Sequence, residues 1–350
     1  MGHRKRRTVQ LFKGHSGDVN DVALSPDGKI AVSASADSTI ILWDTSTGAE
    51  IRKLEGHTDS VNSLVFTPDG KSLLSGSSDR DIILWDMQTG EIIRKFEAVH
   101  GDTIYAVDIS LDGRLAVSGS RDNTVVLWDV ATGKQIKRGF GHTFHVLSVA
   151  FSPDGKTFAS AGRDNTVILW DADPEQRSVN LTEIRRFEGH TDWVFGVIFS
   201  PDSKLLLSGG GDNSLILWDV ASGTRLRRFE GHSSFIYSMA FTPDGRYALS
   251  GAADTTMILW NIETGDDVRR FTGHTDDVRS VAISTDGRTI LSGSGDDTVR
   301  EWQLTLDLGE LRGWLDANRY VRGLTCAERD RFDVPPLCPT PTPVIIPGSV

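Results

Sequence analysis

The chain has 350 residues, of which 38% are hydrophobic and 24% charged, and its formal net charge is −11. So acidic a chain does not favour nucleic acid as its main ligand, and it contains no apolar run of about 18 residues that could span a membrane. Residues 1–7 are basic and no apolar stretch follows them, so we expect a flexible N-terminus and no signal peptide.

A quartet of His, Ser, Asp and Trp recurs seven times with constant internal spacing. The serine follows the histidine by 18 residues, the aspartate comes four residues later, and the tryptophan six after that. The histidines are His15, His57, His100, His142, His190, His232 and His274, and the serines are Ser33, Ser75, Ser118, Ser160, Ser208, Ser250 and Ser292. The aspartates are Asp37, Asp79, Asp122, Asp164, Asp212, Asp254 and Asp296, and the tryptophans are Trp43, Trp85, Trp128, Trp170, Trp218, Trp260 and Trp302. Self-similarity at a fixed period is typical of a modular repeat fold.

Each unit contains four short segments with strand character. In the second unit, Val61–Phe66 is followed by the turn Thr67-Pro68-Asp69-Gly70 and by a second apolar run that ends in Ser-Gly-Ser. The third and fourth segments are Ile82–Trp85 and Glu91–Phe96, separated by a turn that ends in Thr-Gly. Short β-rich runs broken by Pro, Asp and Gly predict hairpins. Each unit is therefore predicted to be a four-stranded antiparallel blade.

Gly-His followed by Trp-Asp at this period resembles the WD-repeat β-propeller family, over residues 8–304. Trp-Asp occurs five times and becomes Trp260-Asn261 and Trp302-Gln303 in the last two units, while the third unit has Val99-His100 in place of Gly-His. These departures affect turn residues, so we expect local adjustments and seven complete blades. The resemblance implies an all-β, seven-bladed propeller of the type found in bacteria.

The two ends of the repeat region are expected to close the ring. The last unit stops after its third segment, Thr298–Leu304, and the chain begins with an unassigned segment, Thr8–Lys13, that matches the fourth-segment pattern of Ile51–Glu55. By resemblance, the first strand completes the last blade and so removes exposed sheet edges. The expected organisation is a basic N-terminus (1–7), a propeller (8–304), a helical extension (305–338) and a Pro-rich disordered end (339–350).

Ser, His and Asp in every unit resemble the components of a hydrolase, but an acyl-transfer site needs one nucleophile in one pocket with an oxyanion hole. Seven equal copies do not match that requirement. The family resemblance implies instead that each quartet forms a structural hydrogen-bond network joining the second and third strands to the loop before the first. The histidines are spread one per blade, unlike clustered metal ligands, so we expect no metal, no cofactor and no enzyme activity.

Pairs of basic residues recur in the fourth segment of six units, from Arg52-Lys53 to Arg269-Arg270. We expect them to protect an exposed strand edge with charge. The alternative is that an anionic partner wraps around the outside of the ring.

By resemblance, three positions per blade point to one face: the third and fifth residues after the quartet His and the residue before the quartet Asp. In blades three to six these positions gather aromatic, apolar and basic residues, and blade seven adds an arginine. The predicted partner-binding residues are Tyr105, Arg121, His145, Leu147, Arg163, Trp193, Phe195, Phe235, Tyr237 and Arg279. Aromatic anchors flanked by arginine are typical of protein-binding hot spots. We therefore predict a scaffold that binds a protein or peptide segment with apolar anchors and some acidic character.

After residue 304 the repeat pattern ends. Leu308, Leu311 and Leu315 have helical spacing, and the stretch from Asn318 to Arg329 resembles tails of WD-repeat regions in large bacterial signalling proteins. The chain could then be the sensor domain of a kinase, cyclase or NTPase. Both cysteines, Cys326 and Cys338, lie in this tail, and whether they pair is left open. A propeller without cysteine fits the reducing cytoplasm, and we expect a monomer.

Overall fold

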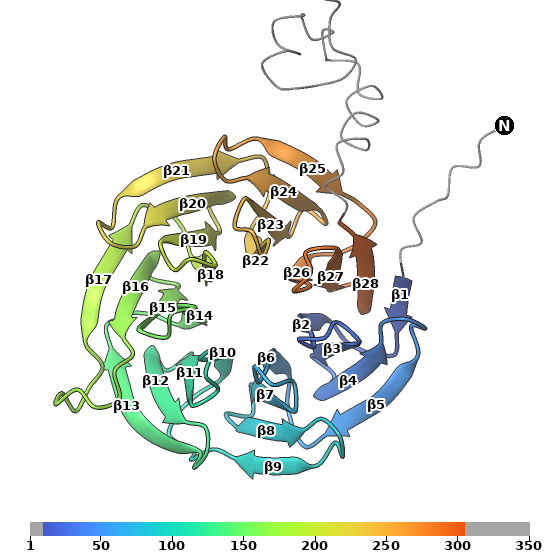
Figure 1. Ribbon diagram of the computed structural model, residues 1–350, viewed down its shortest axis with the longest axis horizontal. Coiled ribbons are helices and arrows are strands. Elements are labelled where there is room, and N and C mark those ends of the chain that lie inside the picture. Colours follow the sequence, from blue (N-terminus) through green and yellow to red (C-terminus); the bar gives the residue numbers. More distant parts are fainter. Residues whose placement is uncertain (1–9, 305–350) are drawn as a thin grey trace, which may run out of the picture. The chain divides into compact units, whose positions relative to one another are not determined.

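A computed structural model describes residues 10–304, which form a ring of seven four-stranded antiparallel sheets (Figure 1). The chain divides into two units, Met1–Leu304 and Thr305–Val350. The expected basic N-terminus (1–7), helical extension (305–338), Pro-rich end (339–350) and both cysteines lie outside the described residues.

Each sheet is one blade, with its first strand nearest the central channel and its last strand at the outside (Figure 1). The strands of blades one to three are β2 (Val19–Leu24), β3 (Ile30–Ser35), β4 (Thr39–Asp44), β5 (Glu50–Glu55), β6 (Val61–Phe66), β7 (Ser72–Ser77), β8 (Ile82–Asp86), β9 (Ile92–Lys95), β10 (Ile104–Ile109), β11 (Leu115–Ser120), β12 (Thr124–Asp129) and β13 (Lys134–Phe140).

Blades four to seven repeat this order. Their strands are β14 (Val146–Phe151), β15 (Thr157–Gly162), β16 (Thr166–Asp171), β17 (Glu183–Glu188), β18 (Val194–Phe199), β19 (Leu205–Gly210), β20 (Ser214–Asp219), β21 (Arg225–Glu230), β22 (Ile236–Phe241), β23 (Tyr247–Ala252), β24 (Met257–Asn261), β25 (Asp267–Phe271), β26 (Val278–Ile283), β27 (Thr289–Ser294) and β28 (Thr298–Gln303).

The N-terminal strand closes the ring, as the sequence predicted. β1 (Gln10–Lys13) pairs antiparallel with β28 and becomes the fourth strand of blade seven. Phe12 lies opposite Val299, is 1% exposed, and its ring centroid is 5.6 Å from that of Trp43 in blade one. Closure therefore combines backbone pairing with burial of an aromatic side chain between the last blade and the first.

The hydrophobic core lies between neighbouring blades. One cluster, for example, joins Val32 and Leu42 of blade one to Val61, Leu73 and Trp85 of blade two. The small central residue of the recurring Ser-Gly-Ser is explained by this packing. A Cβ atom on Gly76 would lie 2.8 Å from Ile104 Cγ2 and 2.9 Å from Val107 Cγ1 of the next blade, so these side chains would have to shift.

Side chains of the innermost strands also link neighbouring blades by hydrogen bonds. In five of the seven blades, the side chain of the third residue of the innermost strand accepts a hydrogen bond from the backbone N–H of the fourth residue of the next blade's innermost strand, at 2.8–3.2 Å. These pairs are Asp21–Leu64, Ser63–Val107, Ser148–Val197, Ser238–Val281 and Ser280–Val22. Blade three has Ala106 at this position, and Asp108 accepts instead from Phe151 N at 2.7 Å.

All seven quartets form the same hydrogen-bond chain, which begins at the tryptophan. The Trp indole N–H donates to the Ser hydroxyl at 2.8–2.9 Å. The seven pairs are Trp43 with Ser33, Trp85 with Ser75, Trp128 with Ser118, Trp170 with Ser160, Trp218 with Ser208, Trp260 with Ser250, and Trp302 with Ser292. All seven serines are 0% exposed, and the tryptophans are 1–8% exposed. A hydroxyl and an indole N–H so deeply buried need partners, and each supplies one for the other.

The chain continues from the serine through the histidine to the aspartate. The Ser oxygen lies 2.7–2.8 Å from Nε2 of His15, His57, His100, His142, His190, His232 or His274. The His Nδ1 lies 2.8–3.0 Å from a carboxylate oxygen of Asp37, Asp79, Asp122, Asp164, Asp212, Asp254 or Asp296. A neutral imidazole that donates from Nδ1 and accepts at Nε2 satisfies every member of this chain.

The basic pairs of the outer strands make bonds between blades rather than only facing solvent. Arg185 donates to Ser222 O at 2.6 Å and Ala221 O at 2.9 Å in the next blade, and Arg227 donates to the corresponding carbonyls, Thr264 O and Glu263 O. The second residue of a pair can instead form an ion pair with the quartet aspartate of its own blade. Arg138 Nη2, for example, lies 2.8 Å from Asp122 Oδ2. Sequence reasoning missed this inter-blade role, because only the three-dimensional arrangement places each arginine beside the next blade's turn.

Candidate interaction site

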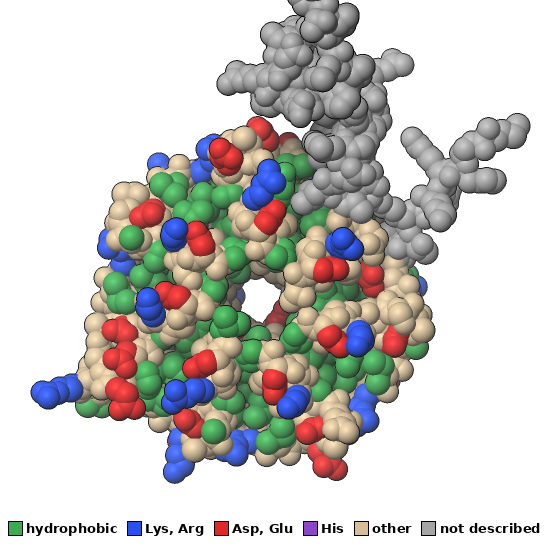
Figure 2. Space-filling view, viewed as in Figure 1, with side chains coloured by type: hydrophobic (Ala, Val, Ile, Leu, Met, Phe, Trp, Pro, Cys, Tyr) green, Lys and Arg blue, Asp and Glu red, His purple; other side chains and the backbone are tan. Residues whose placement is uncertain are grey.

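The two faces of the ring differ in the loops that they carry. One face, here called the loop face, carries the loop before the first strand of each blade and the loop between the second and third strands. The other, the turn face, carries the Pro-Asp-Gly turns, because the strands of each blade alternate in direction. An open channel passes through the centre of the ring (Figure 2).

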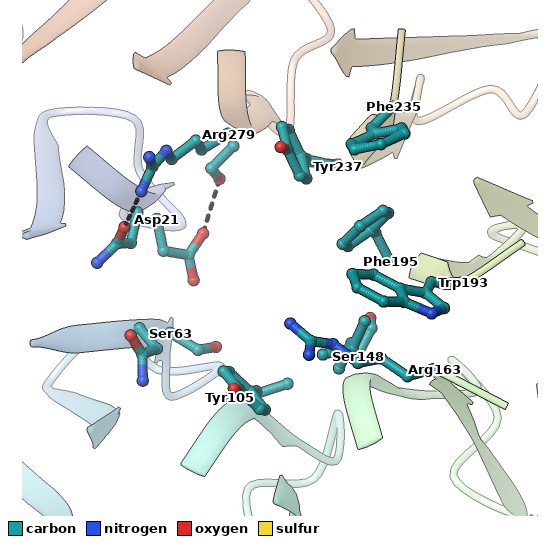
Figure 3. A pocket seen from close by; sticks show the side chains of 16 residues that line it. Asp21, Ser63, Tyr105, Ser148, Arg163, Trp193, Phe195, Phe235, Tyr237 and Arg279 are labelled. Carbon is teal, nitrogen blue, oxygen red and sulfur yellow. Dashed lines mark hydrogen bonds between the residues drawn. The ribbon is translucent and has the colours of Figure 1, made fainter. Parts of the chain in front are cut away.

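A cavity of about 550 Å³ is formed by residues of the innermost strands together with loop-face side chains. Eight of the ten predicted partner-binding residues line it: Tyr105, Leu147, Arg163, Trp193, Phe195, Phe235, Tyr237 and Arg279. Figure 3 shows the side chains of Trp193, Phe195, Phe235 and Tyr237 gathered on one side of the cavity and those of Asp21 and Arg279 on the other. Cavities of this size are typical of ligand sites.

The quartets lie apart from this cavity, and none of their residues lines it. Their polar atoms are already bonded to one another inside the blades, so they offer no free nucleophile or base to a ligand. This holds for the serines Ser33, Ser75, Ser118, Ser160, Ser208, Ser250 and Ser292 and for the tryptophans Trp43, Trp85, Trp128, Trp170, Trp218, Trp260 and Trp302. The structural role predicted for the quartet agrees with this geometry, and stability measurements test it.

The aromatic side is a connected cluster from blades five and six. The ring centroid of Phe195 lies 6.0 Å from that of Trp193, 5.7 Å from that of Phe235 and 5.0 Å from that of Tyr237. Trp193 is 37% exposed and Phe235 40% exposed. The inner rings are thus held by their neighbours, while the outer two leave apolar surface open to a partner.

Basic side chains border this cluster on blades three and four. The Arg163 guanidinium carbon lies 4.2 Å from the centroid of the Trp193 ring, a cation–π contact. His145 stacks on Phe144, with ring centroids 4.3 Å apart, and lies 6.2 Å from the Tyr105 ring. Burial, together with the charges of Arg163 and Arg121, lowers the pKa of His145, so its imidazole is neutral at pH 7.

Arg279 is more closely paired than the other two predicted arginines. Its Nη1 donates to Asn20 Oδ1 at 3.0 Å (Figure 3). Its Nη2 forms an ion pair with Asp18. Nearby, the Tyr237 hydroxyl donates to Asp277 at 3.3 Å. The charge of Arg279 is therefore paired within the protein, and the structure does not place Arg279 beside the aromatic cluster as a free cation.

Two aspartates of the innermost strands have raised pKa values. Burial raises the pKa of Asp21 to about 6, against hydrogen bonds from Ser280 Oγ and the Leu64 and Val22 N–H groups. Burial also raises the pKa of Asp108 to about 6, and the negative charge of Asp21 adds to this shift. The quartet aspartates show the opposite effect: hydrogen bonds outweigh burial and lower the pKa of Asp79 to about 2.

The sequence predicted half of the residues that line the cavity and missed the other half. Arg121 and His145 do not line the cavity and lie beside it, on the blade-three and blade-four loops. Phe144, 46% exposed, was not predicted, because it occupies the position before the one inferred from the resemblance. The inner-strand residues Ser63, Ser148 and Ser238 were also missed; the sixth position after each quartet His would have located them.

The side chains that line and border the cavity are better suited to binding a ligand than to catalysis. His145 is the nearest candidate for an acid or base, yet its Nδ1 has no hydrogen-bond partner within residues 10–304, and no hydroxyl is hydrogen-bonded to its ring there. In that same range no group of three or more His, Cys, Asp or Glu side chains is arranged to hold a metal ion.

Fold and cavity together define a seven-bladed β-propeller with a ligand-sized cavity at its central channel. The chain belongs to the WD40 family (WD domain, G-beta repeat), whose family model matches residues 6–44, 48–86, 90–129, 133–171, 181–219, 223–261 and 265–303. Each match corresponds to one Trp-containing repeat of the sequence.

Individual relatives match over about one repeat. The chain is 46% identical over 46 residues to the human WD repeat-containing protein 36, covering 13% of this chain and 5% of that protein. It is 55% identical over 40 residues to the small ribosomal subunit protein RACK1 of Saccharomyces cerevisiae, covering 11% of this chain and 12% of that protein. It is 43% identical over 51 residues to the transcription initiation factor TFIID subunit 5 of Arabidopsis thaliana, covering 15% of this chain and 8% of that protein.

These three relatives are eukaryotic proteins and give no support to the expected bacterial type of propeller. WD40 propellers are typically protein-interaction scaffolds and usually lack catalytic activity. Within residues 10–304 there is no helix long and apolar enough to cross a membrane.

Proposed function

We propose that this protein is a non-catalytic scaffold that binds a peptide or protein segment at the loop face, over blades three to six. The observation that carries the proposal is the aromatic cluster of Trp193, Phe195, Phe235 and Tyr237, which borders a cavity and leaves its two outer rings more than a third exposed. Large aromatic side chains gathered beside a concave surface are the usual anchors of protein interfaces.

Two further observations support a protein partner. A net charge of −11 disfavours a nucleic acid as the main ligand. RACK1 and TFIID subunit 5 are named as subunits of larger assemblies, which agrees with a scaffold. A cytoplasmic, monomeric protein without a cofactor is part of this proposal.

Replacement of Trp193 and Phe235 by alanine tests the proposal by capture of partners from native lysate. Each side chain is partly exposed, so the fold should be retained, and we expect the captured partner to be lost or reduced at least tenfold. Leu111, 68% exposed in a Pro-Asp-Gly-type turn of the turn face, provides the matched control. Undiminished capture by the Trp193→Ala and Phe235→Ala variants would contradict the proposal.

A further inference from the structure

Two cationic side chains occupy the same loop-face position on neighbouring blades. At the position before the quartet Asp, blades three and four carry Arg121 and Arg163. The other five blades have small residues there: Ala36, Ser78, Gly211, Ala253 and Gly295. The two long cationic side chains therefore stand on neighbouring blades.

Blade four also lacks the negative charge that most loops of this face carry. Five blades have at least one aspartate between the quartet His and the first strand, and these residues are Asp18, Asp59, Asp102, Asp192, Asp276 and Asp277. In blade four the same stretch is Thr143-Phe144-His145. Among residues 10–304, the only acid paired with either arginine is Asp102, whose carboxylate lies 3.8 Å from Arg121 Nε with both side chains about half exposed, an arrangement of small energetic value.

Arg163 and His145 both have unused hydrogen-bonding capacity. The Arg163 side chain makes no hydrogen bond or ion pair with any described residue, and its buried Nε has no partner. His145 Nδ1 is likewise buried without a partner in that part of the chain. Stacking on Trp193 holds the Arg163 guanidinium plane against the aromatic cluster. Arg163 also lines the cavity, so an anionic group on a ligand would meet a guanidinium that no described acid neutralises.

We propose that the loop face recognises an extended peptide segment carrying an anionic side chain close to a bulky apolar one. The anionic group binds at Arg163 and Arg121, and the apolar side chain packs on Trp193, Phe195 and Phe235. The cation–π contact between Arg163 and Trp193 places the two subsites side by side, so the two ligand side chains lie within a few residues of each other. This inference rests on the proposed function and specifies the chemistry of its ligand.

The test is selection of a random dodecapeptide phage library on the full-length protein. Three forms are compared: wild type, the variant Arg121→Gln/Arg163→Gln, and the control Arg114→Gln/Arg246→Gln, which removes the same charge from turns of the turn face. We expect wild type and control to enrich peptides with Asp or Glu within a few positions of Phe, Trp or Leu. The Arg121→Gln/Arg163→Gln variant should keep the apolar enrichment and lose the acidic one.

The strongest peptide is then synthesised with Asp, phosphoserine or Asn at the acidic position, and its binding is measured by fluorescence anisotropy. Arg163→Gln should weaken binding of the Asp or phosphoserine form about tenfold and leave the Asn form unchanged. The tighter of the two anionic forms identifies carboxylate or phosphate as the preferred group. Equal thermal midpoints of the variants show that the fold is intact.

Two different failures are distinguishable. This inference would be overturned if the selected peptides were neutral or basic, or if the Asp and Asn forms bound with equal affinity. It would also be overturned if a single-stranded oligonucleotide bound more tightly and displaced the peptide. No enrichment by wild type, or enrichment that survives Phe235→Ala, would overturn the proposed function itself.

Discussion

Asp108 illustrates how a single residue of an innermost strand links blade packing to pH. Its carboxylate accepts hydrogen bonds from Ile109 N at 2.8 Å and Phe151 N at 2.7 Å, and so joins blade three to blade four where Ala106 cannot. Burial raises its pKa from 3.8 to about 6. The folded state therefore holds the proton more tightly than the unfolded state, and ionisation disfavours folding increasingly as pH rises from about 4 to 6.

Asp108→Asn should stabilise the protein above pH 6 and have little effect below pH 4. The rise in pKa corresponds to at most about 3 kcal/mol in the free energy of unfolding. Because the Asp108 side chain is only partly buried and asparagine offers one hydrogen-bond acceptor fewer, the expected gain is about 1 kcal/mol. Urea unfolding at pH 7.5 and pH 4 measures this. Asp112, whose pKa is lowered mainly by a hydrogen bond from Ser110, is the control: Asp112→Asn should give no gain at pH 7.5. A stability difference independent of pH would contradict the assignment.

A second residue-scale feature is the left-handed position after each quartet Asp. Seven non-glycine residues occupy it with φ between 61° and 75°, among them Asn123, Asn165 and Asn213 but also Thr255 at 66°. A β-branched residue is strained in this region, whereas asparagine tolerates it.

Thr255→Asn should therefore raise the free energy of unfolding by about 0.5–1 kcal/mol, measured by chemical denaturation. The reciprocal change Asn213→Thr, at the equivalent position of blade five, should lower it by a similar amount. Equal and opposite results support backbone strain as the cause; a loss of stability in both variants would point instead to side-chain contacts.

At the scale of the element, each blade contains one quartet, and blade four shows how much depends on the aspartate. Asp164 accepts from His142 Nδ1 and Thr143 N at 2.9 Å and from Thr166 Oγ1 at 2.8 Å. Burial opposes ionisation, but these bonds prevail and lower its pKa to about 2. Its contribution to stability is thus complete above pH 4 and is lost as pH falls towards 2.

Asp164→Ala should destabilise the protein by about 2–4 kcal/mol at pH 7, because it leaves the buried His142 without its partner. The loss should shrink as pH falls below 4. Asp164→Asn, which keeps an acceptor, should cost less. Thermal and urea unfolding measure the stability of each variant. Under conditions where the variant is fully folded, it should still bind peptide at the loop face. Loss of binding under those conditions would show that the quartet acts in recognition.

The blades also show what sequence could and could not predict. Strand positions and the seven-fold repeat follow from spacing and turn residues, because the quartet fixes the register of each copy. The pairing of β1 with β28 is implied by the resemblance to the WD-repeat family together with the match of the first segment to the fourth-segment pattern. The inter-blade bonds of Arg185 and Arg227 could not be predicted, since they depend on the twist that places one blade's outer strand beside the next blade's turn. For the same reason the sequence could not show that Arg279, predicted as a partner-binding residue, is paired with Asp18 and Asn20.

At the scale of the whole molecule, the ring depends on one short strand from the beginning of the chain. Phe12 is 1% exposed at the junction of the last and first blades, while its neighbour Leu11 points away and is 40% exposed. The central cavity exists only while all seven innermost strands surround it, so closure of the ring and formation of the site are coupled.

Phe12→Ala should lower the free energy of unfolding by about 3–4 kcal/mol, the usual cost of a buried phenylalanine truncation. Leu11→Ala, one residue away on the exposed side, should change it by less than about 1 kcal/mol. Comparable effects of the two changes would show that β1 contributes through backbone pairing alone. Denaturant titration of both variants, with size-exclusion chromatography to detect opened and self-associated rings, makes the comparison.

The most direct test of binding at the loop face is site-specific photo-crosslinking. A benzoyl-phenylalanine in place of Phe235 should crosslink the partner in native lysate, because that ring borders the cavity and is 40% exposed. The same photoreactive residue in place of Leu111, more exposed but on the turn face, should not. The predicted result is an adduct that forms only from position 235 and is lost in an Arg121→Gln/Arg163→Gln background. The same adduct from both positions, or from position 111 alone, would contradict binding at the loop face.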